Sequence, residues 1–308
     1  MGEAQRRTAG RHYRRSRRLR SDQRGVVAVV GTLLAMLVFF ALFGVFLEQY
    51  LPLWMTDNES QFTADTESSL AALKANIDLQ AALDGPAVYA TPFTMSSQGV
   101  PVLAQPTAGV LNFVPNNPGV FANVSMTPGP GGASTFFQNF TLGSLTMQLP
   151  NRYYSPQFFT FEDDAVIQSQ SATQQIILYP PGLSLNVSGT SFGATLTLVQ
   201  LLGNATQTVS TGTQEVYSHF LFAQAFTSAP ASGTVSAKFL LGTHYPCAWT
   251  RFLATQFGAS NMGAHATITP SSCQTSTTAS FMKVQFTGLS SFTLVLAEYS
   301  IGVGVGVV

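Results

Sequence analysis

The first regular feature of the chain is an apolar run over residues 26–47, which contains no charged side chain. Twenty-two residues of α-helix, rising 1.5 Å per residue, would be about 33 Å long, enough to cross the hydrocarbon core of a bilayer. Trp54 follows the run, and aromatic side chains are common at the membrane–water interface. The pattern therefore predicts a transmembrane helix over 26–47.

A second helical pattern covers residues 60–83, where the apolar positions fall on one face. The expected apolar face consists of Phe62, Leu70, Leu73, Ile77 and Ala81, and the expected polar surface of Asp65, Lys74, Asp78 and Gln80. Gly85 and Pro86 give a stop signal. Residues 48–85 are therefore predicted to extend the N-terminal helix, with a kink or interruption at Pro52.

From Pro86 onward the apolar positions alternate with polar ones, and Gly/Pro-rich turns separate the segments. Strands are predicted over 109–114, 120–126, 142–149, 157–162, 165–168, 175–179, 183–187, 194–202, 234–241, 265–269, 280–286 and 291–301. One short helix is expected over 247–257, and a flat terminal strand over 301–308. The predicted class is α+β, a long hydrophobic N-terminal helix followed by a mainly antiparallel, β-sandwich-like domain over 86–308.

The charges are few and segregated. Only 9% of the residues are charged, and the formal net charge is zero. Residues 1–25 nevertheless carry nine arginines against two acidic residues, so this Arg-rich leader has a charge of +7 and the remainder −7. By the positive-inside rule the N-terminus stays cytoplasmic and the domain after the span lies outside the cell. No nucleic-acid partner is expected, although an RNA-binding arm is the alternative interpretation of the arginines.

The candidate catalytic motifs have non-catalytic explanations. Gly189-Thr190-Ser191-Phe192-Gly193 matches the G-x-S-x-G of serine hydrolases, but a strand pattern follows it where the motif requires a helix. Glu162-Asp163-Asp164 lies between two predicted strands and is expected at a hairpin tip. The four histidines show no metalloprotease spacing. No catalytic, cofactor-binding or metal-binding residue is predicted, and an ectoenzyme is only a minor alternative.

Cys247 and Cys273 are the only cysteines. Both follow the predicted span, and an extracellular pair favours oxidation, so a disulfide is predicted. The alternatives are free thiols or a zinc set with His244 and His265, whose spacing fits no common zinc finger.

Five N-glycosylation sequons also follow the predicted span. Their asparagines are Asn58, Asn123, Asn139, Asn186 and Asn204. Because the predicted topology places all five outside the cell, all are candidate modification sites.

The segment Gln23-Arg24-Gly25-Val26-Val27, followed by AVVGTLLAML, resembles the class III signal peptide of archaeal type IV pilins. The resemblance implies that a prepilin-type peptidase cuts between Gly25 and Val26 and that Arg24 precedes the site. Residues 151–162 and 245–249 also look like segments of archaeal pilin-like surface proteins, although that group would have Gly at Asp163-Asp164.

The resemblance implies a structural function. The expected protein is a pilin-like subunit or minor pilin, whose 26–47 helix packs with copies of itself or other pilins in a filament. The alternative is a single-pass, glycosylated surface protein that stays in membrane lipid through 26–47 and binds a partner or the cell envelope. The two hypotheses differ in whether the leader is removed.

Overall fold

The computed structural model describes residues 6–83, 85, 87–189, 191–273 and 280–304. The chain forms two compact units, one up to Trp54 and one from Met55 onward. Helix α1 (Arg6–Leu83) runs through the first unit and continues into the second, where strands dominate. The predicted α+β class, a long apolar N-terminal helix followed by a mainly antiparallel β-rich domain, is confirmed.

Pro52 does not interrupt α1, which is helical from Arg6 to Leu83. The expected interruption is therefore wrong, and a kink at Pro52 stays a prediction. A proline removes one backbone hydrogen bond and crowds the preceding turn. Here that local cost is opposed by long helical segments on both sides, which supply all the other backbone bonds of the helix.

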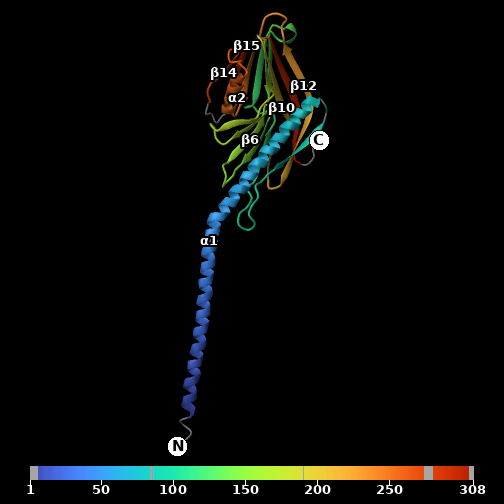
Figure 1. The fold of residues 1–308 in the computed structure, drawn as a ribbon. Helices are drawn as coiled ribbons and strands as arrows, with labels where there is room; N and C mark the ends of the chain where they lie inside the picture. The colour runs from blue at the N-terminus through green and yellow to red at the C-terminus, as the bar shows by residue number, and fades with distance from the viewer. Residues whose placement is uncertain (1–5, 84, 86, 190, 274–279, 305–308) are drawn as a thin grey trace. The chain divides into compact units, whose positions relative to one another are not determined.

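The strands form three sheets (Figure 1). The central sheet contains, in spatial order, β1 (Val88–Thr94), β12 (Thr213–Ser228), β16 (Ser291–Val303), β10 (Ser191–Gly203) and β9 (Leu183–Ser188). The helix-side sheet contains β11 (Thr206–Ser210), β2 (Gly109–Val114), β5 (Ser144–Leu149), β6 (Gln157–Glu162), β7 (Ala165–Ser169) and β8 (Gln175–Tyr179). The outer sheet contains β14 (Ala266–Thr269), β15 (Ser280–Leu289), β13 (Val235–Thr243), β3 (Phe121–Thr127) and β4 (Phe136–Thr141).

The central sheet contributes to two hydrophobic cores through opposite faces. On β16, Phe292, Leu294 and Leu296 belong to a core shared with the outer sheet. Ala297, Tyr299 and Ile301 belong to a core shared with α1 and the helix-side sheet. Successive side chains of a strand point to opposite faces of its sheet. The first half of β16 therefore buries one face of the central sheet, and the second half of β16 buries the opposite face.

Every predicted strand is present, with ends shifted by a few residues, and the predicted short helix is α2 (Pro246–Ala259). The strands β1, β4, β11 and β12 and the short 3-10 helix η1 (Pro130–Gly132) were not predicted. Of the predicted terminal strand 301–308, β16 includes residues 301–303; residues 305–308 lie outside the described residues.

The second half of α1, residues 55–83, packs along the strands of its own unit (Figure 1). The predicted apolar side chains Phe62, Leu70, Leu73 and Ile77 are buried, each at most 1% exposed. Three expectations for this helix are wrong, because Lys74 and Gln80 are buried and Ala81 is exposed. In the last turn of the helix Gln80 is buried in place of Ala81. The Gln80 amide donates to the carbonyl oxygens of Ala87 and Ser218 at 2.9 and 2.8 Å.

Candidate membrane segment and the polar contacts that hold its helix

None of the described residues of the first unit covers the apolar part of α1. The helix from Gly25 is long and apolar enough to cross a membrane, with a mean hydropathy of 2.8 over 18 residues, none of them buried. Large side chains are exposed on every side of it; Val27 is 71%, Leu37 68% and Phe40 59% exposed. A helix that is apolar all round requires a non-aqueous surrounding, which lipid or other apolar helices provide.

The predicted processing residues Arg24, Gly25 and Val26 lie within α1, directly before and at the start of this apolar segment. Val26 is 63% exposed. A side chain added at Gly25, Gly31 or Gly44 would meet nothing within 4 Å. The glycines therefore leave open backbone that another helix can approach closely, as small residues do in membrane helix pairs.

Glu59 attaches the beginning of the buried part of α1 to the loop after β5. Its carboxylate accepts the backbone N–H groups of Arg152, Tyr153 and Tyr154 at 2.7–3.0 Å and the hydroxyl of Thr107 at 2.8 Å. Burial alone would raise the pKa of Glu59, but these hydrogen bonds outweigh it and lower the pKa. Glu59 is therefore a buried anion whose charge the loop backbone stabilises.

We expect E59Q to lower the free energy of unfolding at pH 7 by about 2 kcal/mol, because an amide nitrogen replaces one accepting oxygen among several donors. The partly exposed Glu67 provides the matched variant E67Q, with little expected change. Since the pKa of Glu59 is lowered, its contribution is present at neutral pH and is lost as the pH falls through that pKa. Urea titrations of the full chain in detergent at pH 7 and pH 3 measure both effects; equal losses at both pH values would contradict this role.

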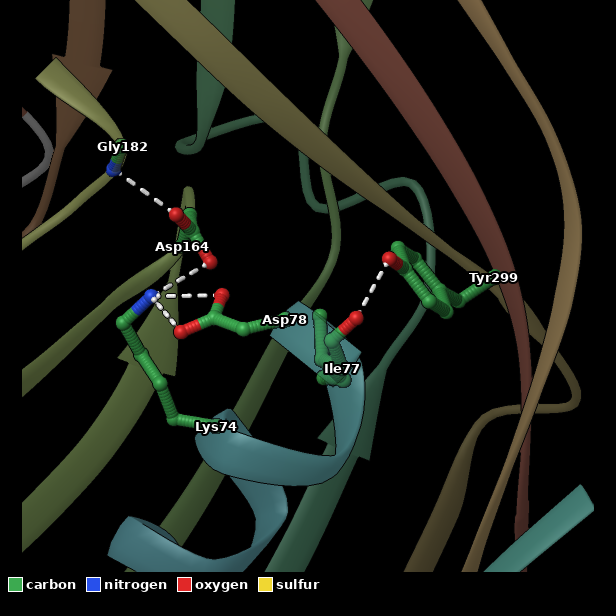
Figure 2. A network of polar contacts seen from close by, with 6 residues as sticks. All are labelled: Lys74, Ile77, Asp78, Asp164, Gly182 and Tyr299. Atoms are coloured by element: carbon green, nitrogen blue, oxygen red, sulfur yellow. Dashed lines mark hydrogen bonds and ion pairs between the residues drawn. The ribbon is translucent and has the colours of Figure 1, made fainter. Parts of the chain in front are cut away.

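A second polar contact joins α1 to the turn between β6 and β7 (Figure 2). Asp163 and Asp164 form a two-residue turn in which both have positive φ, 47° and 62°. Such turns match the twist of a hairpin, and aspartate tolerates this backbone conformation better than most residues. The hairpin-tip prediction for Glu162-Asp163-Asp164 is confirmed, but all three side chains are buried rather than solvated.

The ammonium group of Lys74 lies between two carboxylates, Asp164 at 2.9 Å and Asp78 at 2.9 and 3.0 Å (Figure 2). The other oxygen of Asp164 accepts the backbone N–H of Gly182 at 2.8 Å. Burial raises the pKa of Asp164 to about 6, although the charge of Lys74 acts in the opposite direction. One turn along, the Tyr299 hydroxyl donates to the Ile77 carbonyl oxygen at 2.8 Å, which ties α1 to the central sheet.

Glu162 points away from α1 toward α2. One of its oxygens accepts hydrogen bonds from the Thr243 hydroxyl and, at 3.2 Å, from the Trp249 indole. Within the described residues the other oxygen has no hydrogen-bond partner. Burial raises the pKa of Glu162 to about 7, although these two donors and the backbone N–H of His244 act in the opposite direction. Burial and the charges of Asp164 and Glu162 also raise the pKa of Asp163 well above its usual range.

Cys247 and Cys273 form the predicted disulfide, with their Cα atoms 4.5 Å apart. The bond occupies both thiols, so the alternative zinc set with His244 and His265 does not form here. Cys247 lies in the first turn of α2, and its backbone N–H donates to the Gln175 side chain on β8 at 3.1 Å. The disulfide therefore links the buried start of α2 to the segment after β14.

The five sequon asparagines lie on several elements of the second unit. Asn139 on β4, Asn186 on β9 and Asn204 beside β11 are exposed. Asn123 on β3 is partly exposed and is the direct cross-strand partner of Asn139. The Asn58 amide on α1 donates to the Gln98 carbonyl oxygen at 2.9 Å. Asn139, Asn186 and Asn204 are consequently the sequons most open to an enzyme.

Within the described residues, neither the hydrolase-like motif nor a metal site is assembled. Ser191 of the hydrolase-like motif begins β10 and pairs with Ser188 of β9, so a strand follows where a hydrolase would have a helix. Among the described residues, no group of three or more potential ligands could hold a metal ion.

The buried ionic contacts were missed by sequence reasoning. One signal was available, because the spacing of Leu70, Leu73 and Ile77 places Lys74 on the buried face of its helix. A lysine in such a stripe requires a buried partner. The partner Asp164 is 90 positions away, and nothing local identifies it.

Comparisons with known proteins identify no relative of this chain. None of the protein-family models, curated proteins or solved structures compared with it matches. Its function must therefore be argued from its own residues.

Proposed function

We propose that this chain is a structural, pilin-like surface protein, a subunit or minor pilin of a type IV pilus-like filament. One observation carries the proposal: an apolar helical segment exposed on all sides continues directly into a helix that a β-rich unit buries. This division lets one end of a single helix enter lipid or a helix bundle while the other end carries a folded domain. The disulfide supports a location in an oxidising compartment outside the cytoplasm.

Removal or retention of the leader distinguishes a filament subunit from a permanently anchored protein. Its +7 charge holds the N-terminus at the anionic cytoplasmic surface, so a protein that stays anchored gains nothing by losing it. Inside a bundle of apolar helices the same charge would carry a heavy desolvation cost. A filament subunit must therefore lose residues 1–25, and a prepilin-type peptidase acting between Gly25 and Val26 would remove them.

We expect G25D to block this processing, because it places a charged side chain where the peptidase would require a small residue. The variant should accumulate in the membrane with its leader attached. The matched variant G10D adds the same charge within the leader and should be processed normally. Electrophoretic mobility and terminal sequencing of both variants, expressed in the native host, measure the effect.

Normal processing of G25D, or an unprocessed wild-type chain, would contradict the filament proposal. An unprocessed wild-type chain that resists alkaline extraction would instead support the alternative, a single-pass surface protein whose span stays in the membrane.

A further inference from the structure

Lys74 and Asp164 bring an amino group and a carboxyl group into contact inside the β-rich unit (Figure 2). The Lys74 nitrogen lies 2.9 Å from one oxygen of Asp164, and the two side chains are only 10% and 4% exposed. Lys74 is on α1, and Asp164 is in the turn between β6 and β7. Two groups held together in this way react as though each were present at very high concentration. The contact therefore has the composition and geometry that condensation to an amide requires.

Burial favours the reactive forms of both groups. An amino group attacks a carbon atom only after it has lost its extra proton, and a carboxyl group is attacked readily only when it is protonated. Because burial penalises both charges, proton transfer from the Lys74 ammonium to the Asp164 carboxylate costs less here than it would in water. The pKa of Asp164 agrees with this, since burial raises it to about 6 against the charge of Lys74.

Two neighbouring groups can assist the attack. The Asp164 oxygen that does not contact Lys74 accepts the backbone N–H of Gly182 at 2.8 Å, and this donor stabilises negative charge that develops on that oxygen. The two oxygens of Asp78 lie 2.9 and 3.0 Å from the Lys74 nitrogen, so this carboxylate can take a proton from it. The side chain of Asp78 is 53% exposed, so the contact is open to solvent on this side.

We propose that Lys74 and Asp164 condense after folding into an intramolecular amide bond, with Asp78 as the proton carrier. The ammonium group first gives a proton to Asp164. The free amine attacks the Asp164 carboxyl carbon, and the carbonyl electron pair moves to the oxygen held by Gly182. Asp78 then carries a second proton from the nitrogen to the hydroxyl oxygen, and one water molecule leaves as the carbonyl group re-forms. One carbon–nitrogen bond forms and one carbon–oxygen bond breaks, without an oxidant or a reductant.

The amide attaches α1 covalently to the hairpin of β6 and β7 and replaces a buried ion pair by a neutral group. Two buried charges whose desolvation is costly are thereby removed. Unlike the disulfide between Cys247 and Cys273, this bond withstands reduction. The ion pair is the state before the reaction, so its own effect on stability is that of chains that have not lost water. The amide depends neither on removal of the leader nor on membrane anchorage.

Mass spectrometry of chymotryptic peptides from the reduced full chain tests the proposal. The wild-type chain should give a branched peptide that joins a segment containing Lys74 to a segment containing Asp164, with the mass of the two segments less one water molecule. K74M removes the amino group and should abolish this peptide. K238M makes the same substitution at an exposed lysine on β13 and should retain it.

D78N tests the proton carrier, because an amide cannot accept the proton. After synthesis of the full chain, the branched peptide should accumulate about 100-fold more slowly in D78N than in the wild-type chain. The partly exposed Asp65 of the same helix provides the matched variant D65N, which should react at the wild-type rate. Circular dichroism of both variants reports whether they fold.

Two results for the wild-type chain would overturn the proposal, and neither depends on the folding of a variant. The first is the absence of the branched peptide from chain that has been kept folded for days. The second is a loss of water confined to an unbranched peptide around Asp164, which would indicate a cyclic imide formed with the backbone. An unchanged rate in folded D78N would contradict the role of Asp78.

Discussion

Replacement of Lys74 by methionine is expected to lower the free energy of unfolding by about 3–5 kcal/mol at pH 7, because it leaves a buried carboxylate without its cation. Lys74 is the cation that contacts Asp164, whose side chain is only 4% exposed. Methionine keeps most of the volume of the aliphatic chain, so lost packing contributes little. Urea denaturation of the full chain in detergent, followed by tryptophan fluorescence, measures the change.

Two controls separate the ion pair from general damage. K238M makes the same substitution at an exposed lysine on β13 and should change stability by less than about 0.5 kcal/mol. K74M combined with D164N removes both charges and should recover most of the loss, since no unpaired buried charge remains. A K74M loss no larger than that of K238M, or no recovery in the double variant, would contradict the role of this contact.

The second large effect is a stabilisation. E162Q should raise the free energy of unfolding at pH 8 by about 3 kcal/mol and leave it nearly unchanged at pH 4. Burial raises the pKa of Glu162 from 4.5 to about 7. A raised folded-state pKa means that the folded chain holds a proton which the unfolded chain has lost. The contribution of Glu162 to the free energy of unfolding is therefore greatest below about pH 4.5 and declines as the pH rises through about 7.

The neutral amide of E162Q keeps an acceptor for the Thr243 hydroxyl and the Trp249 indole, but it does not ionise. The partly exposed Glu215 provides the matched variant E215Q, which should leave the pH dependence of the wild-type chain intact. Denaturation curves at pH 4, 6 and 8 compare the three proteins. Reduced stability of E162Q at pH 8 would mean that the carboxylate is held by a favourable interaction rather than penalised by burial.

The apolar helical segment and most strands were predictable because their signals are local. An uncharged run of 22 residues indicates a long apolar helix, and two-residue alternation indicates a strand with one buried face. Strand β12 was missed because its bulge at Leu221 shifts the alternation, and its residues 221–225 are exposed on both faces. Strand β1 was obscured by Pro92, and β11 by its short, polar sequence.

The polar contacts of α1 could not be predicted because they join distant parts of the chain. Glu59 accepts from residues more than 90 positions away, and Lys74 pairs with Asp164 at a similar separation. Most of the donors to Glu59 are backbone N–H groups of a loop. Because nearly every residue has such a group, the sequence does not show which of them will bind a carboxylate. The hairpin tip at Asp163-Asp164 was predicted, but its burial was not, because the cover comes from other elements.

The measurement that most directly tests the pilin-like assignment is the intact mass and N-terminal sequence of the native protein, isolated from its own cell surface. The proposed function predicts a mature chain that begins at Val26 and lacks all nine arginines of the leader. A native chain that retains residues 1–25 in the cell envelope would contradict the filament account and leave a permanently anchored surface protein in its place.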